Sequence, residues 1–246
     1  MKRECIQGLW IGRRLSLMER LSIRSFLAQG HPYHLYVYGP VQGVPKGVVV
    51  RDAKTILPRS RLFRIARGKG RGSLASFSNL FRYKLLSQRG GWWVDLDVVC
   101  LRPFEFPTPY VFALERTPQG DTRVCPGILK VPKGCAFIRR CYEQAASRDP
   151  ARVRFGETGA LLLEPILRAH RLALYAQPPR VFCPLDWWAF HWAIDPAIRF
   201  PLESSSAVHL WNELWRRRGL SKDGSYDPAC LYEHLRVRFR VRRTAR

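Results

Sequence analysis

The sequence lacks several features that would restrict its function at once. No apolar run reaches the roughly 18 residues of a membrane-spanning helix, so we expect no transmembrane segment. The first residues contain no sustained apolar stretch, and we expect no signal peptide. Internal repeats, low-complexity tracts and clear linkers are also missing. A single domain spanning residues 1–246, with a basic C-terminal tail at about 231–246, is therefore the simplest organisation.

Acidic residues are scarce. The chain has 19 Asp and Glu against 42 Lys and Arg, which gives a formal net charge of +23. Such a field attracts polyanions, so nucleic acid, an anionic membrane and phosphorylated substrates are all admissible partners. Because arginine greatly outnumbers lysine, the excess can instead reflect genomic base composition, and both explanations stay open.

Zinc-finger spacing is missing as well. None of the seven cysteines forms a CxxC pair, and their odd number without a repeated spacing indicates reduced thiols in a cytoplasmic protein. The hydrophobic content of 46% and aromatic content of 12% exclude a disordered chain.

The first third of the sequence predicts an α/β fold that begins with parallel strands. A helix is expected at residues 16–29, where Ser16 and Glu19 form a capping box. A stronger helix at residues 73–89 ends at a Gly-Gly pair. Strands are expected at residues 5–11, 33–38 and 48–50.

The later elements are predicted from shorter patterns. Residues 236–243 alternate charged and apolar side chains, which favours a basic edge strand or an arm that touches a membrane. Further strands are expected at residues 110–114, 128–131 and 180–182, and helices at residues 135–146 and 160–167.

Residues 90–97 (GGWWVDLD) combine a tight turn, an apolar strand and two aspartates. Because residues i and i+2 of a strand point to the same side, Asp95 and Asp97 are expected to project together. Two like charges in an apolar framework repel each other, and a divalent cation would compensate them. Hard ions such as Mg²⁺ and Mn²⁺ prefer carboxylate and phosphate oxygens.

Together with the preceding helix, this segment resembles a known family. Residues 78–86 (SNLFRYKLL) and 90–97 resemble the Asp-X-Asp sugar-binding region of glycosyltransferases, in which Ser-Asp-X-X-Arg precedes Gly-Gly-X-Tyr/Trp-X-Asp-X-Asp. That group includes the α-mannosyltransferases of family 32, bacterial capsule and lipooligosaccharide transferases, and the clostridial glucosylating toxins. The similarity is specific in order and spacing over residues 73–104.

Weaker similarity extends to both ends of the chain. Residues 6–10 (IQGLW) resemble the family's opening strand, and residues 207–215 (AVHLWNELW) resemble its late His-X-Trp-X-X-X-Trp element. The resemblance implies a GT-A-like α/β fold with a mixed, largely parallel sheet. It also implies metal-dependent, retaining transfer of a hexose from a UDP- or GDP-sugar to a glycan or glycolipid hydroxyl, with Mn²⁺ or Mg²⁺.

The resemblance also assigns residues. Asp95, Asp97 and His209 would hold the metal, and the two aspartates with Arg82 would act in catalysis. Arg82, Asn79 and Asp95 would contact the donor, and Trp10 would stack on its base. For His209 a structural role stays open, as does a simple core role for Trp10.

The acceptor side is less defined. Thr158, in the segment before the apolar run at 160–167, is expected near it. Trp187 and Trp188 offer aromatic faces that suit sugar C–H groups, although a buried aromatic cluster is an equal alternative.

Two positions depart from the family pattern. Asn79 replaces the Asp of Ser-Asp-X-X-Arg, which removes a negative charge, and Ala160 follows Thr158-Gly159 where relatives have Pro. An inactive homologue is therefore one alternative. A non-catalytic protein that binds nucleic acid or another polyanion is a second, although no nucleic-acid-binding motif supports it. For an enzyme, the basic surface predicts peripheral contact with anionic lipid at the inner face of the membrane.

Overall fold

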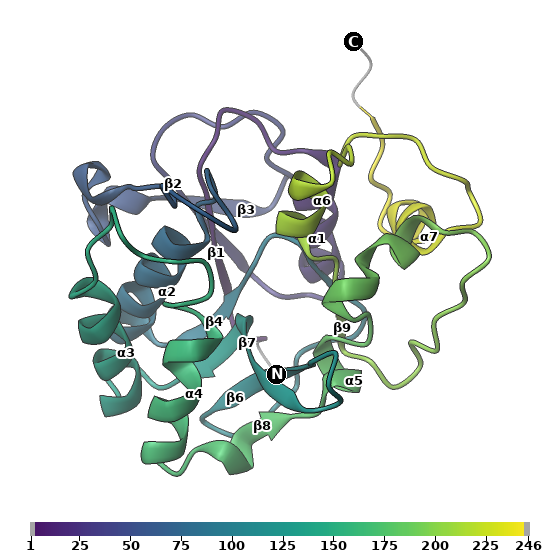
Figure 1. Ribbon diagram of the computed structural model, residues 1–246. Helices are drawn as coiled ribbons and strands as arrows, with labels where there is room; N and C mark the ends of the chain where they lie inside the picture. Colours follow the sequence, from purple (N-terminus) through teal and green to yellow (C-terminus); the bar gives the residue numbers. More distant parts are fainter. Residues whose placement is uncertain (1–2, 244–246) are drawn as a thin grey trace.

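The computed structural model describes residues 3–243 (Figure 1). Its central sheet has seven strands in the order β3-β2-β1-β4-β7-β6-β8. Of these, β7 runs antiparallel to its neighbours β4 and β6, and the other pairs are parallel, which confirms the mixed, largely parallel sheet. The strands are β1 (Ile6–Trp10), β2 (Tyr33–Val37), β3 (Val48–Asp52), β4 (Gly91–Val94), β6 (Val111–Arg116), β7 (Thr122–Val131) and β8 (Ala176–Gln177).

A second, two-stranded sheet and several helices complete the fold. The small sheet pairs β5 (Val98–Cys100) with β9 (Ala207–His209) in antiparallel fashion. The α-helices are α1 (Leu17–Ala28), α2 (Ala75–Arg89), α3 (Ala136–Ala146), α4 (Ala160–Ala169), α5 (Pro179–Phe182), α6 (Asn212–Arg217) and α7 (Leu231–Arg238). Short 3₁₀ helices span Ala53–Thr55, Arg59–Arg61, Ala173–Tyr175 and Trp187–Ile194.

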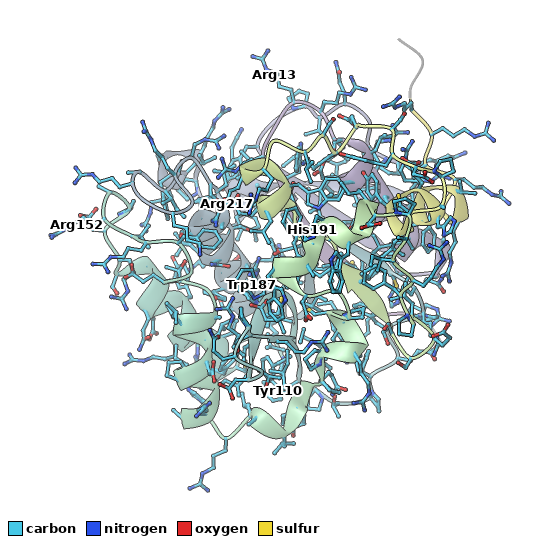
Figure 2. All side chains as sticks on the ribbon, turned by 45° about the vertical axis from the view of Figure 1, so that its right-hand side comes forward. Arg13, Tyr110, Arg152, Trp187, His191 and Arg217 are labelled. Atoms are coloured by element: carbon cyan, nitrogen blue, oxygen red, sulfur yellow. The ribbon has the colours of Figure 1, made fainter. Side chains whose placement is uncertain are left out.

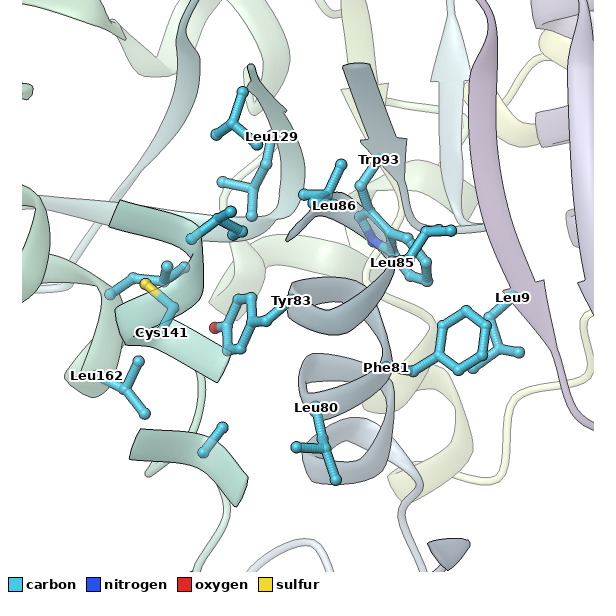
Figure 3. Close-up of a cluster of buried hydrophobic side chains, with 14 of the residues drawn as sticks. Leu9, Leu80, Phe81, Tyr83, Leu85, Leu86, Trp93, Leu129, Cys141 and Leu162 are labelled. Carbon is cyan, nitrogen blue, oxygen red and sulfur yellow. The ribbon is translucent and has the colours of Figure 1, made fainter. Parts of the chain in front are cut away.

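The main sheet separates two hydrophobic layers. One layer packs α2, α3 and α4 against one face of the sheet, with Phe81, Tyr83 and Trp93 among its buried side chains (Figures 1 and 3). The other layer packs α1 and the end of α5 against the opposite face. A third cluster, around the buried Trp215, joins α6, α7 and the 3₁₀ helix Trp187–Ile194.

Local sequence signals set the two helices that precede the site. The capping box of α1 is present as predicted, because Ser16 Oγ accepts from the Met18 amide and the Ser16 amide donates to Glu19. At the end of α2, Gly90 has φ +66°, and a Cβ there would lie 2.4 Å from the Lys133 backbone nitrogen. Only glycine fits, so the chain reverses there into β4.

The order of the strands places a topological switch point between β1 and β4. From β1 the chain adds β2 and β3 on one side, and it then returns to place β4 on the other. The carboxyl ends of these neighbouring strands are Trp10 and Val94. In open α/β sheets ligands bind in the crevice at such a point. The described fold therefore indicates a binding site beside Trp10 and the residues that follow Val94.

Two predicted elements are wrong. Residues 180–182 lie in helix α5, which begins with a Pro at its first position, where a helix tolerates proline. The predicted basic edge strand at 236–243 is instead the end of α7 and the turn that follows it. Leu235 and Phe239 are buried there against the third hydrophobic cluster, and this packing overrides the alternating pattern. Residues 244–246 of the predicted tail lie outside the described residues.

No helix within residues 3–243 combines the length and the apolar character needed to cross a bilayer.

Candidate active site

Asp95 and Asp97 lie on the turn between β4 and β5. Strand β4 ends at Val94, so the strand geometry predicted for this pair is wrong. The turn is fixed by the Asp95 amide, which donates to the Gly127 carbonyl at 2.8 Å, and by the Val98 amide, which donates to the Asp95 carbonyl. The two carboxylates nevertheless converge. One oxygen of each and a ring nitrogen of His209 lie within 4.8 Å of one another.

The junction between β9 and α6 holds Asp97. The Asn212 amide donates to Asp97 Oδ2 at 2.7 Å, and His209 Nε2 lies 3.2 Å from Asp97 Oδ1. On the main chain, the Leu210 amide donates to the Asp97 carbonyl at 2.8 Å. Asp97 precedes His209 by 112 positions in the chain. Backbone and side-chain interactions together hold the two residues side by side.

The His209 ring is fixed from both sides. It stacks on Trp211 with ring centroids 3.8 Å apart, and its Nδ1 lies 3.6 Å from Cys125 Sγ. Trp211 has left-handed backbone angles (φ 59°, ψ 49°), which are uncommon for a bulky residue. Such a conformation persists only where its surroundings impose it, and here the Trp211 indole also donates to the Leu185 carbonyl.

Helix α2 contributes a buried guanidinium. Arg82 Nη2 donates to Asp95 Oδ1 at 2.5 Å, and Nη1 donates to Asn79 Oδ1 at 2.7 Å. The guanidinium carbon lies 4.9 Å from the centroid of Trp93, whose indole donates to the same Asp95 oxygen. Because Asn79 and Arg82 are one helical turn apart, α2 presents both toward the Asp95 turn.

Thr158 holds the Asn79 side chain by a hydrogen bond. Asn79 Nδ2 donates to Thr158 Oγ1 at 3.2 Å, and the Tyr83 hydroxyl donates to the Thr158 carbonyl. Thr158 is buried. The structure thus places Thr158 beside Asn79, a predicted donor contact, and its own predicted acceptor contact stays a prediction.

Trp10 ends β1 at the same sheet edge. Its Nε1 is buried without a hydrogen-bond partner among residues 3–243, and Lys222 Nζ lies 5.3 Å from its ring. Stacking on a base stays a prediction. The indoles of Trp187 and Trp188 meet edge to face, and Trp187, near the centre of Figure 2, lies beside Arg123. Trp188 is 37% exposed, so it is not part of a fully buried cluster.

Burial and neighbouring charges shift the pKa values of Asp95, Asp97 and His209 in different directions. Burial raises the pKa of Asp95, and the nearby Arg82 only partly opposes this. Burial would also raise the pKa of Asp97, but the charge of His209 and the hydrogen bonds from His209 and the Asn212 amide together lower it. Burial would lower the pKa of His209, yet Asp97 and Cys125 together raise it well above its usual value through charge and hydrogen bonds. In the absence of a metal, Asp97 and His209 therefore form a buried ion pair.

The donor set fits a hard divalent cation. Two carboxylates and an imidazole suit Mg²⁺ or Mn²⁺, which take oxygen ligands in near-octahedral geometry. Bonds of about 2.1 Å at right angles separate neighbouring ligands by about 3 Å. The 3.2 Å between His209 Nε2 and Asp97 Oδ1 is close to that separation.

Gly127 of β7 is a site residue that the sequence prediction missed. A Cβ at Gly127 would lie 3.0 Å from His209 Cε1 and 3.3 Å from Asp95 Oδ2. The missing side chain therefore leaves open the space between the carboxylate and the imidazole. The signal available was Pro126-Gly127, a pair that usually marks a turn but here interrupts a strand pattern.

The fold is similar to that of a solved glycosyltransferase structure. A structure described as "PaToxG Glycosyltransferase" has a TM-score of 0.51 with 12% identity, over 97% of this chain and 84% of that chain. A transferase mutant with two Cys-to-Ser substitutions has a TM-score of 0.45 with 10% identity, over 70% of this chain and 86% of that chain. No family model matches the sequence, and no curated protein matches it. The first similarity, with the mixed sheet, shows a GT-A-like fold.

Proposed function

We propose that this protein is a metal-dependent, retaining glycosyltransferase that moves a hexose from a nucleotide-diphosphate sugar to a hydroxyl group. The observation that carries the proposal is the meeting of Asp95, Asp97 and His209 at the switch-point edge of the sheet. Two carboxylates and an imidazole that converge in this way form a ligand set suited to a divalent cation. The fold likeness to a glycosyltransferase supports this choice over other metal-dependent reactions.

The chemistry requires charge neutralisation. When the bond between the anomeric carbon and the donor phosphate breaks, the diphosphate leaves with its negative charge. A divalent ion held by Asp95, Asp97 and His209 would neutralise that charge as a Lewis acid. Arg82 adds a fixed positive charge and orients Asp95, since its two terminal nitrogens are bound to Asp95 and Asn79.

The partners follow from the same proposal. The donor is a UDP- or GDP-hexose whose base stacks on Trp10, and the acceptor is a glycan or glycolipid that meets Trp187 and Trp188. We place the enzyme at the inner face of a membrane, held by its basic surface. Two arginines of α7 are partly engaged within the protein, because Arg236 pairs with Glu233 and Arg238 donates to a backbone carbonyl. The lipid contact would therefore use other arginines as well.

Calorimetric titration with a panel of nucleotide sugars, with and without Mn²⁺, tests the proposal. We expect Mn²⁺-dependent binding of one donor and slow hydrolysis of that donor, both lost in Asp97→Asn. Asp121→Asn is the matched control, since Asp121 is exposed on the turn between β6 and β7. Failure of every donor to bind with Mn²⁺, together with salt-sensitive DNA or RNA binding, would support the polyanion-binding alternative instead. Donor binding without hydrolysis or transfer would identify an inactive homologue.

A further inference from the structure

We propose a second metal site, for a soft cation such as Zn²⁺, formed by Cys125, Cys183 and His209. Their two sulfurs and a ring nitrogen lie within 4.8 Å of one another. Thiolate and imidazole are the ligands that zinc prefers, whereas Mg²⁺ and Mn²⁺ prefer oxygen. The set therefore differs in chemistry from the carboxylate site on the other side of the same imidazole.

The spacing already approaches that of a tetrahedral zinc centre. Zn–S bonds of about 2.3 Å and Zn–N bonds of about 2.0 Å at the tetrahedral angle separate sulfur and nitrogen by about 3.5 Å. Cys125 Sγ lies 3.6 Å from His209 Nδ1. Binding zinc would thus require little movement of this pair.

Three separate elements hold the ligands in place. Cys125 is on β7, Cys183 directly follows α5, and His209 ends β9. All three are buried, and the stacked Trp211 keeps the ring in its plane. Three protein ligands leave the fourth position of a tetrahedral centre to a water molecule. This leaves the open position that non-structural zinc sites retain.

His209 links the two sites. Its Nδ1 faces Cys125, and its Nε2 faces Asp97. A neutral imidazole has one lone pair, so it can bind a metal through only one nitrogen at a time. Zinc at the thiols would therefore exclude the catalytic metal from His209, a consequence that rests on the proposed function. Binding Zn²⁺ releases the two thiol protons and the Nδ1 proton of His209 to solvent, and the two thiolates balance the charge of the ion.

Co²⁺, a spectroscopic substitute for Zn²⁺, tests the site without any assay of transfer. We expect one equivalent of Co²⁺ to produce a thiolate-to-cobalt charge-transfer band and tetrahedral d–d bands, and Zn²⁺ to abolish both. Cys125→Ser and Cys183→Ser should each lower the charge-transfer intensity by about half or more, since one of the two thiolates is removed. Cys141→Ser is the matched control, because Cys141 is an equally buried thiol in the hydrophobic layer beside Tyr83 and Leu162 (Figure 3).

The spectra alone can overturn the proposal. Wild-type protein without the charge-transfer band has no such site, even if a serine variant fails to fold. A band of undiminished intensity in folded Cys125→Ser or Cys183→Ser also contradicts it. Asp97→Asn should keep the band, since its carboxylate is not a ligand of the soft metal. If the protein shows the band but binds no nucleotide sugar, the zinc site is supported and the proposed function is contradicted.

Competition gives a second readout. Mn²⁺ binding is followed by the electron paramagnetic resonance signal of free Mn²⁺. If the two metals compete for His209, the Zn²⁺ concentration that halves Mn²⁺ binding should rise as the Mn²⁺ concentration is raised. Cys183→Ser should shift that concentration upward by at least about tenfold, as expected for loss of one of three protein ligands. Zinc binding that leaves the Mn²⁺ affinity unchanged would contradict the sharing of His209.

Discussion

At the scale of single residues, the positive charge of Arg82 compensates part of the negative charge of the candidate site. Its guanidinium is buried and bound to one carboxylate, Asp95, and to one neutral amide, Asn79. In the pattern that this sequence resembles, an aspartate occupies the amide position, and the guanidinium would lie between two carboxylates. Asn79 therefore leaves the Arg82 charge less compensated and more available to an anionic donor.

Asn79→Asp tests the importance of that charge. The new carboxylate can accept from Arg82 Nη1 and from the Thr158 hydroxyl, which can rotate to donate, so we expect little change in stability. If the proposed site is attenuated by its missing charge, the rate of donor hydrolysis should rise by about tenfold, equivalent to about 1.4 kcal/mol of barrier. Thr158→Val in the same assay removes the hydrogen bond between positions 79 and 158 without adding a charge, so it separates the effect of that bond from the effect of the charge. An unchanged rate in an active enzyme would show that this charge does not limit turnover.

Gly127→Ala tests the open space between the ligands. The added methyl group would press on His209 Cε1 at 3.0 Å and on Asp95 Oδ2 at 3.3 Å. We expect Mn²⁺ affinity to fall by about tenfold or more, since misplacing a ligand by a few tenths of an ångström weakens a metal site. Gly39→Ala is the control, because a Cβ there meets nothing within 4 Å. Equal Mn²⁺ affinity in the two variants would contradict the crowding.

The pH dependence of metal affinity follows from His209. Asp97 raises the pKa of His209 well above 6.5, so near neutral pH the folded protein holds a proton that a metal must displace. Metal affinity should therefore rise with pH by about tenfold per unit at pH values below the folded-state pKa of His209 and level off above it. Mn²⁺ titrations at three pH values measure the slope, and His209→Gln should flatten it. Affinity that falls as pH rises would contradict proton displacement.

At the scale of elements, the capping box of α1 stabilises the first turn of that helix, so its loss should lower the stability of the protein by a modest amount. Ser16→Ala removes the side-chain acceptor of the Met18 amide at the start of a helix that packs against the sheet. The free energy of unfolding should fall by about 1 kcal/mol, the usual cost of losing a Ser N-cap. Urea denaturation measures this loss, with Ser147→Ala, after the end of α3, as a control outside any N-cap. Unchanged stability would mean that the cap is redundant.

Elements with strong local signals were predictable from sequence. The caps and periodicity placed α1 and α2 within two residues of their observed bounds, and Gly90 marked the end of α2. Elements defined by tertiary packing were not predictable. The alternating residues at 236–243 satisfy a strand pattern, yet Leu235 and Phe239 are buried from a helix and its following turn. Local alternation cannot reveal which neighbours will cover a face.

The turn after Val94 shows the same limit within the site. The sequence predicted that the two aspartates act together, and the structure brings them together, but by a different route. Strand β5 leaves the main sheet to pair with β9, so the chain must turn at Asp95–Asp97. No residue within the turn signals this change of sheet, because the partner strand lies more than 100 positions later in the sequence.

At the scale of the whole molecule, the candidate site depends on strand order. Helix α2, the turn after β4, strand β7 and the β9–α6 junction each supply one part of it. The family resemblance could propose that Asp95, Asp97 and His209 form one site, since it compares whole motifs. No sequence motif includes Gly127, Cys125 or Cys183, and only the folded structure shows that they lie beside His209. The residues that shape the space between the ligands therefore emerged only with the structure.

The net charge of +23 is also a property of the whole molecule. Arg13 and Arg152 are exposed and project from different parts of the molecular outline in Figure 2, so the excess is spread over the surface. If the overall field drives association with anionic lipid, Arg13→Glu and Arg152→Glu should each lower binding to anionic vesicles by a similar, several-fold amount. Vesicle co-sedimentation measures this, with uncharged vesicles as the control. Binding should also weaken as ionic strength approaches about 0.15 M, where the Debye length is about 8 Å. A large loss in one variant and none in the other would instead identify a single docking face, because a field set by net charge responds to the number of charges and not to their position.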